Sequence, residues 1–88
     1  MYVVKVKECI PELVLRKQCD RLFNYIESLP DKHIVVDFED FELCSRAFIH
    51  QYLMNKQKSK KKIEEANINN FIADMIDIVK KSIKNNLP

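Results

Sequence analysis

The amino-acid sequence predicts an α/β fold, with a small mixed or mainly parallel sheet covered by about three helices. Segments with the two-residue period of strands alternate with segments of helical period, in the order strand, helix, strand, helix, strand, helix. The 88 residues, of which 47% are apolar, suffice for one modest core and are too few for two. We therefore expect a single domain over residues 1–88, with a lysine-rich loop at about residues 56–62.

The chain begins with a predicted strand and a predicted helix. In residues 2–8, Val4 and Val6 alternate with lysines, as in a strand with one wet face. Pro11 follows, and its fixed φ suits the first turn of a helix. Apolar residues then recur every three or four positions, which predicts an amphipathic helix that ends near Pro30. This stripe consists of Leu15, Cys19, Leu22, Ile26 and Leu29.

A central strand and a second helix are predicted next. Residues 34–36 are consecutive β-branched residues, which favours a strand buried on both faces, and Asp37 ends this apolar run. Ser45 is a candidate N-cap, because its hydroxyl can accept a backbone N–H of the first helical turn. The helix is expected to end near Asn55. Its apolar stripe consists of Phe48, Ile49, Tyr52 and Leu53.

The last third of the chain predicts a loop at residues 56–60, a short edge strand at about residues 61–66 and a helix capped by Asn67. The stripe of this helix consists of Ile68, Phe71, Ile72, Met75, Ile76, Val79 and Ile83. Three further apolar residues lie beside the stripe of the first helix and leave self-association, and hence the oligomeric state, open: Leu13, Val14 and Phe23.

The composition argues against several classes of protein. The chain has no glycine, which Walker-type and dinucleotide-binding loops need for their close approach to phosphate. The gaps between its three cysteines are too wide for a typical zinc site, so we expect no metal and no other cofactor. The odd number of cysteines indicates a reducing compartment. We expect Cys19 and Cys44 to be buried. Neither a signal peptide nor an apolar run of the roughly 20 residues that span a membrane is evident, which predicts a soluble, cytoplasmic protein without a membrane partner.

Two sets of residues could carry chemistry, and each has a simpler interpretation. An acidic set could act in acid–base chemistry or hold Mg²⁺: Asp37, Glu39, Asp40 and Glu42. Strand alternation puts its first two members on one face and sends Asp40 elsewhere, so solvated or helix-start carboxylates are the simpler interpretation. Cys44 and His50 lie six residues apart and point in different directions on a helix, which argues against a nucleophile and its base. We expect no enzymatic activity.

Three motifs together carry a family resemblance. They are RKQCDRL at residues 16–22, IVVDFEDFELCSRAF at residues 34–48, and ANINNFIADMIDIV, with an asparagine before the last helix, at residues 66–79. In these motifs the chain resembles the STAS domain of bacterial anti-sigma-factor antagonists and, more closely, the STAS-like family of unknown function. The resemblance covers roughly residues 11–83 and agrees with the fold predicted from periodicity.

The resemblance implies a non-enzymatic regulatory module that docks onto a protein partner, such as a kinase-like ATPase or a transcription regulator. The surface implied is the turn and helix at about residues 39–50. The residues expected near it are Glu39, Asp40, Glu42, Ser45, Arg46 and His50. A solvated charged loop is the alternative interpretation of the same residues.

The resemblance also raises the question of phosphorylation at Ser45. In STAS antagonists a serine in the first turn of this helix is phosphorylated, and the added charge abolishes binding to the partner. The alignment puts Ala47 at that position and Phe48 where those domains often carry glycine, which leaves Ser45 as the nearby hydroxyl. A phosphate is electrostatically favourable at a helix N-terminus, and an ordinary capping serine is the alternative.

A second functional class follows from KQKSKKK at residues 56–62. Its five lysines could contact phosphates of a nucleic acid, although the net charge of the chain is only +2. They are Lys56, Lys58, Lys60, Lys61 and Lys62. Aromatic residues for base stacking are missing from the run, and Glu64 and Glu65 follow at once. A solvated loop that keeps an edge strand from pairing with other chains explains the same lysines.

Overall fold

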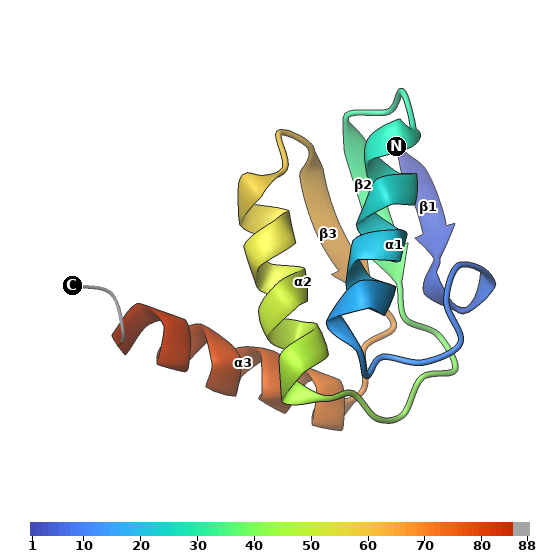
Figure 1. Cartoon of the computed structure of the whole chain (residues 1–88). Coiled ribbons are helices and arrows are strands. Elements are labelled where there is room, and N and C mark those ends of the chain that lie inside the picture. Colours follow the sequence, from blue (N-terminus) through green and yellow to red (C-terminus); the bar gives the residue numbers. More distant parts are fainter. Residues whose placement is uncertain (86–88) are drawn as a thin grey trace.

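The computed structural model describes residues 1–85 and has the predicted order of elements (Figure 1). These elements are β1 (Tyr2–Lys5), a short 3₁₀ helix (Val6–Glu8), α1 (Arg16–Ser28), β2 (His33–Asp37), α2 (Arg46–Lys58), β3 (Lys62–Ala66) and α3 (Asn70–Asn85). The end of the predicted domain, residues 86–88, lies outside the described residues. Within residues 1–85, no helix is both long and apolar enough to cross a membrane.

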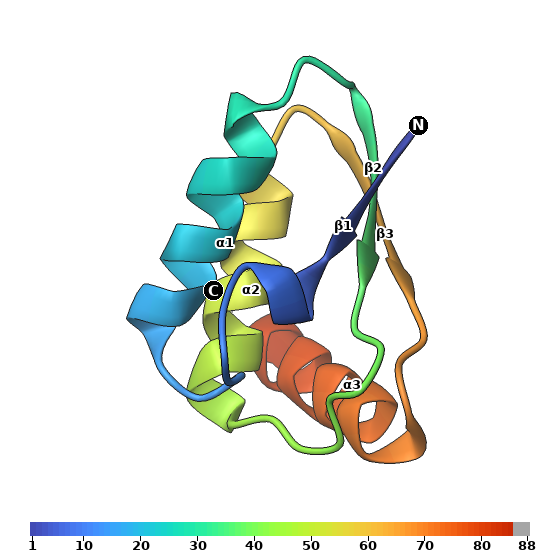
Figure 2. The same cartoon turned by 90° about the vertical axis from the view of Figure 1, so that its right-hand side faces the viewer.

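All three strands are parallel and stand in the order β1-β2-β3, which confirms the α/β prediction. Because each strand is added on the same side of the last, crossovers of the usual right hand put both connecting helices on one face of the sheet. Figure 2 shows α1 and α2 on that face, while α3 crosses below the carboxyl ends of the strands. Within the described part of the chain, the opposite face carries no helix.

β2 is the central strand, as predicted, but a helical layer covers only one of its faces. Ile34 and Val36 are fully buried, whereas Val35 lies between Val3 and Glu64 in the register of the open face and is partly exposed. The prediction of burial on both faces is therefore wrong. Val35 is only partly exposed because the side chains of Val3 and Glu64 flank it on the neighbouring strands.

The core fills the space between the sheet and the helices. Tyr52 meets Phe23 and Phe38 edge to face, with ring centroids 5.4 and 5.6 Å apart. Cys19 and Cys44 are buried, as predicted. Other fully buried side chains are Val6, Leu22, Ile26, Ile34, Val36, Phe48, Ile49 and Ile72. Two side chains of the segment between β2 and α2, Phe38 and Cys44, are buried in this core.

β1 is shorter than the strand predicted over residues 2–8. It ends at Lys5, and Val6 begins the 3₁₀ helix. The backbone N–H groups of Cys9 and Ile10 donate to the carbonyl of Val6, at 2.9 and 3.0 Å. Val6 is nevertheless fully buried, so the alternation of apolar and charged residues continues beyond the end of the strand.

α1 begins at Arg16 and not near Pro11, so the predicted helix start is wrong. Residues 11–15 form a loop that ends at a side-chain cap, where Gln18 Oε1 accepts the N–H of Leu15 at 2.8 Å. Leu15 itself precedes the helix and is largely exposed, although its spacing suggested a core position. Periodicity alone could not detect this, because Leu15 lies one helical turn before Cys19.

α2 runs to Lys58, beyond the predicted end near Asn55. The N–H of Ser59 donates to the carbonyl of Asn55 at 3.0 Å, which closes the last turn. Lys56 and Lys58 are therefore helical, whereas the sequence predicted a loop. β3 confirms the short edge strand expected at about residues 61–66.

α3 begins later than predicted, because Asn69 and not Asn67 caps it. Asn69 Oδ1 accepts the N–H of Ile72 at 2.9 Å. Asn67 has a left-handed backbone, with φ of 55°, which asparagine tolerates better than most residues. Ile68 and Phe71, which the sequence placed in the apolar stripe, are exposed.

Candidate functional site

Asp37 organises the β2–α2 junction, residues 38–45. Its Oδ1 accepts the backbone N–H of Glu39 and the side-chain amide of Asn67, both at 2.9 Å. The bond from Asn67, and then the bond from Glu39, lowers the pKa of Asp37 below its ordinary value of 3.8. Asp37 is a buried carboxylate. It connects the start of the junction, at Glu39, with Asn67, the first residue after β3.

Ser45 fastens the other end of the junction and confirms the predicted N-cap. Its Oγ accepts the N–H of Phe48 at 2.9 Å and donates to the carbonyl of Val14 at 2.5 Å. Its own N–H donates to the carbonyl of Leu13 at 2.8 Å. A phosphate on Ser45 would remove the hydroxyl hydrogen and with it the bond to Val14.

The predicted acidic set does not converge on one point. Lys7 brings Asp40 and Glu39 together, since its Nζ lies 2.6 Å from Asp40 Oδ2 and 3.7 Å from Glu39 Oε2. The hydrogen bond to Asp40 raises the pKa of Lys7. Glu42 is exposed, and within residues 1–85 no three side chains of the metal-ligating types gather. The acidic residues therefore present surface charge around Lys7.

An apolar patch lies where the junction meets the loop before α1. Val14, Leu15 and Leu43, which we call the Leu43 patch, are 44%, 57% and 68% exposed. Val14 and Leu43 line a shallow groove of about 340 Å³ between residues 11–14 and 40–43. The sequence singled out Val14 as an apolar residue beside the stripe, but it assigned Leu15 to the helical stripe of α1 and did not indicate Leu43. The available signal was the pair of apolar residues directly before the first residue of the helix.

A basic groove lies at the N-terminal turns of α2, beside residues of α1 and α3. It has a volume of about 360 Å³ and is lined by Arg16, Arg46, Ala47, His50, Val79 and Ser82. Arg16 Nη1 lies 3.0 Å from His50 Nδ1, and Arg46 Nη2 donates to Ser82 Oγ at 3.0 Å. The sequence predicted Arg46 and His50 for this surface. It could not indicate Arg16 and Ser82, which come from other helices.

Cys44 and His50 do not form a catalytic pair in this arrangement. His50 Nδ1 faces Arg16, and burial raises the pKa of the Cys44 thiol, which disfavours the reactive thiolate. Burial, followed by the charge of Asp20, raises the pKa of Cys19 to about 12. Both buried cysteines are therefore inert thiols at neutral pH.

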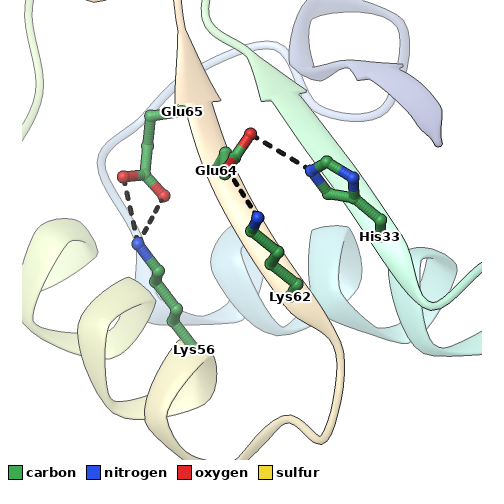
Figure 3. A network of polar contacts seen from close by, with 5 residues as sticks. All are labelled: His33, Lys56, Lys62, Glu64 and Glu65. Atoms are coloured by element: carbon green, nitrogen blue, oxygen red, sulfur yellow. Dashed lines mark hydrogen bonds and ion pairs between the residues drawn. The ribbon is translucent and has the colours of Figure 1, made fainter.

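The five predicted lysines are divided among three elements, and two of them bind glutamates (Figure 3). Lys56, on α2, places its Nζ 3.1 and 3.0 Å from the two carboxylate oxygens of Glu65. Lys62, on β3, lies 3.4 Å from Glu64. The two glutamates that follow the lysine run thus bind part of it.

Of the remaining lysines, Lys58 is the last helical residue of α2, and Lys60 and Lys61 lie in the turn that leads to β3. Lys61 donates to the backbone carbonyls of Leu29 and Asp31, both at 2.6 Å, so its ammonium holds the α1–β2 loop. Lys58 and Lys60 are exposed and form no ion pair with any of residues 1–85. The basic surface available from the run therefore consists mainly of two side chains.

Comparison of the chain with protein-family models, with curated proteins and with solved structures finds no match. The resemblance of the junction to STAS domains therefore stays a prediction. Within residues 1–85, the structure shows a compact α/β fold with a three-stranded parallel sheet and three α-helices.

Proposed function

We propose that this chain is a non-enzymatic docking module that binds a protein partner through the β2–α2 junction. The observation that supports the proposal most is the Leu43 patch, of which Val14 and Leu43 are exposed on one groove together with Asp40 and Glu42. Contiguous exposed apolar groups with a polar rim are typical of protein interaction sites. The alternative, a solvated charged loop, gives no reason for the exposure of Leu43.

The hydrogen bonds of the junction support the same proposal. Asp37 holds the start of the turn, and Ser45 ties its end to Val14, which is itself a member of the patch. A turn held in this way loses little conformational entropy when a partner binds. The patch is therefore presented on a preorganised surface.

The predicted charged residues line the groove of the patch or the basic groove and are suited to partner selection. Asp40 and Glu42 line the same groove as Leu43, whereas Arg46 and His50 line the basic groove. Rim charges of both signs steer association and reject partners with the wrong pattern. The resemblance to STAS domains supports a regulatory partner, such as a kinase-like ATPase or a transcription regulator.

The proposal is tested by capturing partners from cells with the tagged chain, with and without nuclease. Leu43→Glu should reduce capture of a nuclease-resistant, stoichiometric protein about tenfold or more, because a central apolar contact is replaced by a charge. Ile78→Glu is the matched control, since Ile78 is an exposed apolar residue of α3 outside the patch. Equal capture by the two variants would exclude the Leu43 patch as the docking site.

A nucleic-acid-binding role is the second candidate, and it depends on the exposed Lys58 and Lys60. Two phosphate contacts would give weak binding that salt abolishes. Loss of all captured material after nuclease, together with loss of RNA binding in a Lys58→Gln, Lys60→Gln double variant, would favour this role. Retention of RNA binding in the double variant would exclude these lysines.

A further inference from the structure

The basic groove brings together polar groups from three helices. Arg16 is the first residue of α1, Arg46 and His50 lie in the first two turns of α2, and Ser82 comes from α3. Ala47 and Val79 supply an apolar floor. The side chains come from positions separated by up to 66 residues of sequence and meet only because α1, α2 and α3 pack together.

Each of these polar groups keeps at least one hydrogen-bond donor for a ligand, although Arg16 Nη1 already contacts His50 Nδ1 at 3.0 Å and donates to Gln51 Oε1 at 3.3 Å. A guanidinium has no acceptor, so the contact between Arg16 Nη1 and His50 Nδ1 requires His50 to accept there, which leaves its Nε2–H to donate. Ser82 Oγ accepts from Arg46, and its own hydrogen is free to donate. The groove is thus lined by two cations and two neutral donors.

Carboxylates do not neutralise the groove. Within residues 1–85, neither Arg16 nor Arg46 forms an ion pair. The nearby carboxylate on α1, Asp20, accepts hydrogen bonds at 3.0 Å from the side-chain amides of Gln51 and Asn55. Asp20 forms no direct ion pair with Arg16, because Gln51 lies between them and accepts from Arg16 Nη1 at 3.3 Å. The two guanidiniums therefore have no direct carboxylate partner at the groove.

We propose that the basic groove binds a phosphate monoester carried by a side chain of the protein partner. Three terminal oxygens with a charge near −2 match two guanidiniums and two neutral donors better than a carboxylate does. Leu15 of the Leu43 patch is followed in the chain by Arg16 of the groove. In this proposal the phosphate of the segment binds between Arg16 and Arg46, and its apolar residues contact the patch. This inference rests on the proposed docking function.

The test uses the full chain labelled with ¹⁵N and three probes: inorganic phosphate, a short synthetic peptide with one phosphoserine flanked by leucines, and the same peptide without phosphate. We expect the phosphopeptide to bind about tenfold tighter or more than its unphosphorylated twin. The amide signals of Arg16, Arg46 and Ala47 should shift. In the Arg16→Gln, Arg46→Gln double variant the two peptides should bind equally.

Arg21→Gln is the matched control, because Arg21 is an exposed arginine of α1 that does not line the groove. It should keep the preference for the phosphopeptide. Equal binding of both peptides to the unmodified chain, or a preference that survives in the double variant, would overturn the proposal. Binding of inorganic phosphate as tightly as the phosphopeptide would also overturn it, in favour of a free anion.

The proposed docking function can fail separately. Leu43→Glu should weaken binding of both peptides and leave the shifts caused by inorganic phosphate unchanged, because Leu43 does not line the basic groove. If Leu43→Glu binds both peptides as tightly as the unmodified chain, while the Arg16→Gln, Arg46→Gln double variant loses the preference for the phosphopeptide, the Leu43 patch is excluded and the phosphate site is retained.

Discussion

Glu64 and Glu65 are neighbours in the chain, yet they lie on opposite faces of β3 and have opposite surroundings (Figure 3). Glu65 faces the helices: its Oε2 accepts the hydroxyl of Tyr52 at 2.6 Å, its carboxylate binds Lys56, and its side chain is 18% exposed. Glu64 faces the open side of the sheet, where it contacts His33 at 3.1 Å and Lys62 at 3.4 Å and is 49% exposed.

The difference predicts that burial, and not the number of contacts, decides what an ion pair contributes to stability here. Both carboxylates bind two partners, but water competes for Glu64 and much less for Glu65. The comparison also explains the lysine run. Its first and last members, Lys56 and Lys62, each bind one of the two glutamates, so a stretch that suggested nucleic-acid binding is partly structural.

The largest effect is expected when Glu65 is removed. Glu65→Ala leaves the buried Tyr52 hydroxyl without its acceptor and Lys56 without its counterion. An unsatisfied buried donor and a broken, partly buried ion pair should together lower the free energy of unfolding by about 2–4 kcal/mol. Urea unfolding at neutral pH measures this loss.

Glu64→Ala is the internal control for that measurement. Its effect should be several times smaller, because exposed ion pairs contribute little. If the two alanine variants are equally destabilised, burial does not distinguish the two glutamates and the comparison fails.

A smaller effect is expected at alkaline pH, where Tyr52 would ionise. Burial, followed by the charge of Glu65, raises the pKa of Tyr52 well above 10.0. The folded state therefore keeps the phenol proton at pH values where the unfolded chain loses it. Stability should be unaffected below about pH 10 and should then fall by up to about 1.4 kcal/mol per pH unit.

The Tyr52→Phe variant isolates this contribution, because it lacks the ionising group while other alkaline titrations remain. Its stability should fall less steeply than that of the unmodified chain between about pH 10 and 11. Parallel curves would show that Tyr52 ionises normally.

At neutral pH the same substitution should have a modest cost. Tyr52→Phe removes one charge-assisted hydrogen bond, yet Glu65 keeps Lys56 as its partner. We expect a loss of about 1–2 kcal/mol, smaller than that of Glu65→Ala. A double-mutant cycle with Glu65→Ala, which removes the acceptor, measures the coupling between the two residues, and a coupling near zero would contradict the contact.

Periodicity predicted most of the fold. The alternation of periods gave the order of the elements, three β-branched residues located the central strand, and Ser45 was identifiable as a cap. The boundaries were less accurate where side chains from elsewhere decide them. Asn67 was mistaken for a cap because its bond to Asp37 spans 30 residues, whereas the actual cap, Asn69, lies only two positions later.

The candidate site was predicted in part. The acidic turn, Arg46 and His50 follow from local motifs, and the structure brings Arg46 and His50 together in one groove. Arg16 could not be predicted, because its place beside His50 depends on how α1 packs against α2. Leu43 was overlooked because a single leucine between Glu42 and Cys44, in a turn, has no periodic signal.

The smallest effect is expected for the acid titration of Glu64. The hydrogen bond from His33, followed by that from Lys62, lowers the pKa of Glu64 below 4.5. A lowered folded-state pKa means that the unfolded chain takes up a proton first as the pH falls. The contribution of Glu64 is therefore present above about pH 4.5 and lost as the pH falls through the folded-state pKa.

The urea midpoint of Glu64→Gln should consequently be slightly lower than that of the unmodified chain at neutral pH. This difference in midpoint should shrink in acid. Because Glu64 lies on the open face, 1 M salt should reduce the neutral-pH difference as well, by screening both partners. A difference that grows in acid, or that salt leaves unchanged, would mean that Glu64 acts through packing. In that case the two faces of β3 would be less different than their exposure indicates.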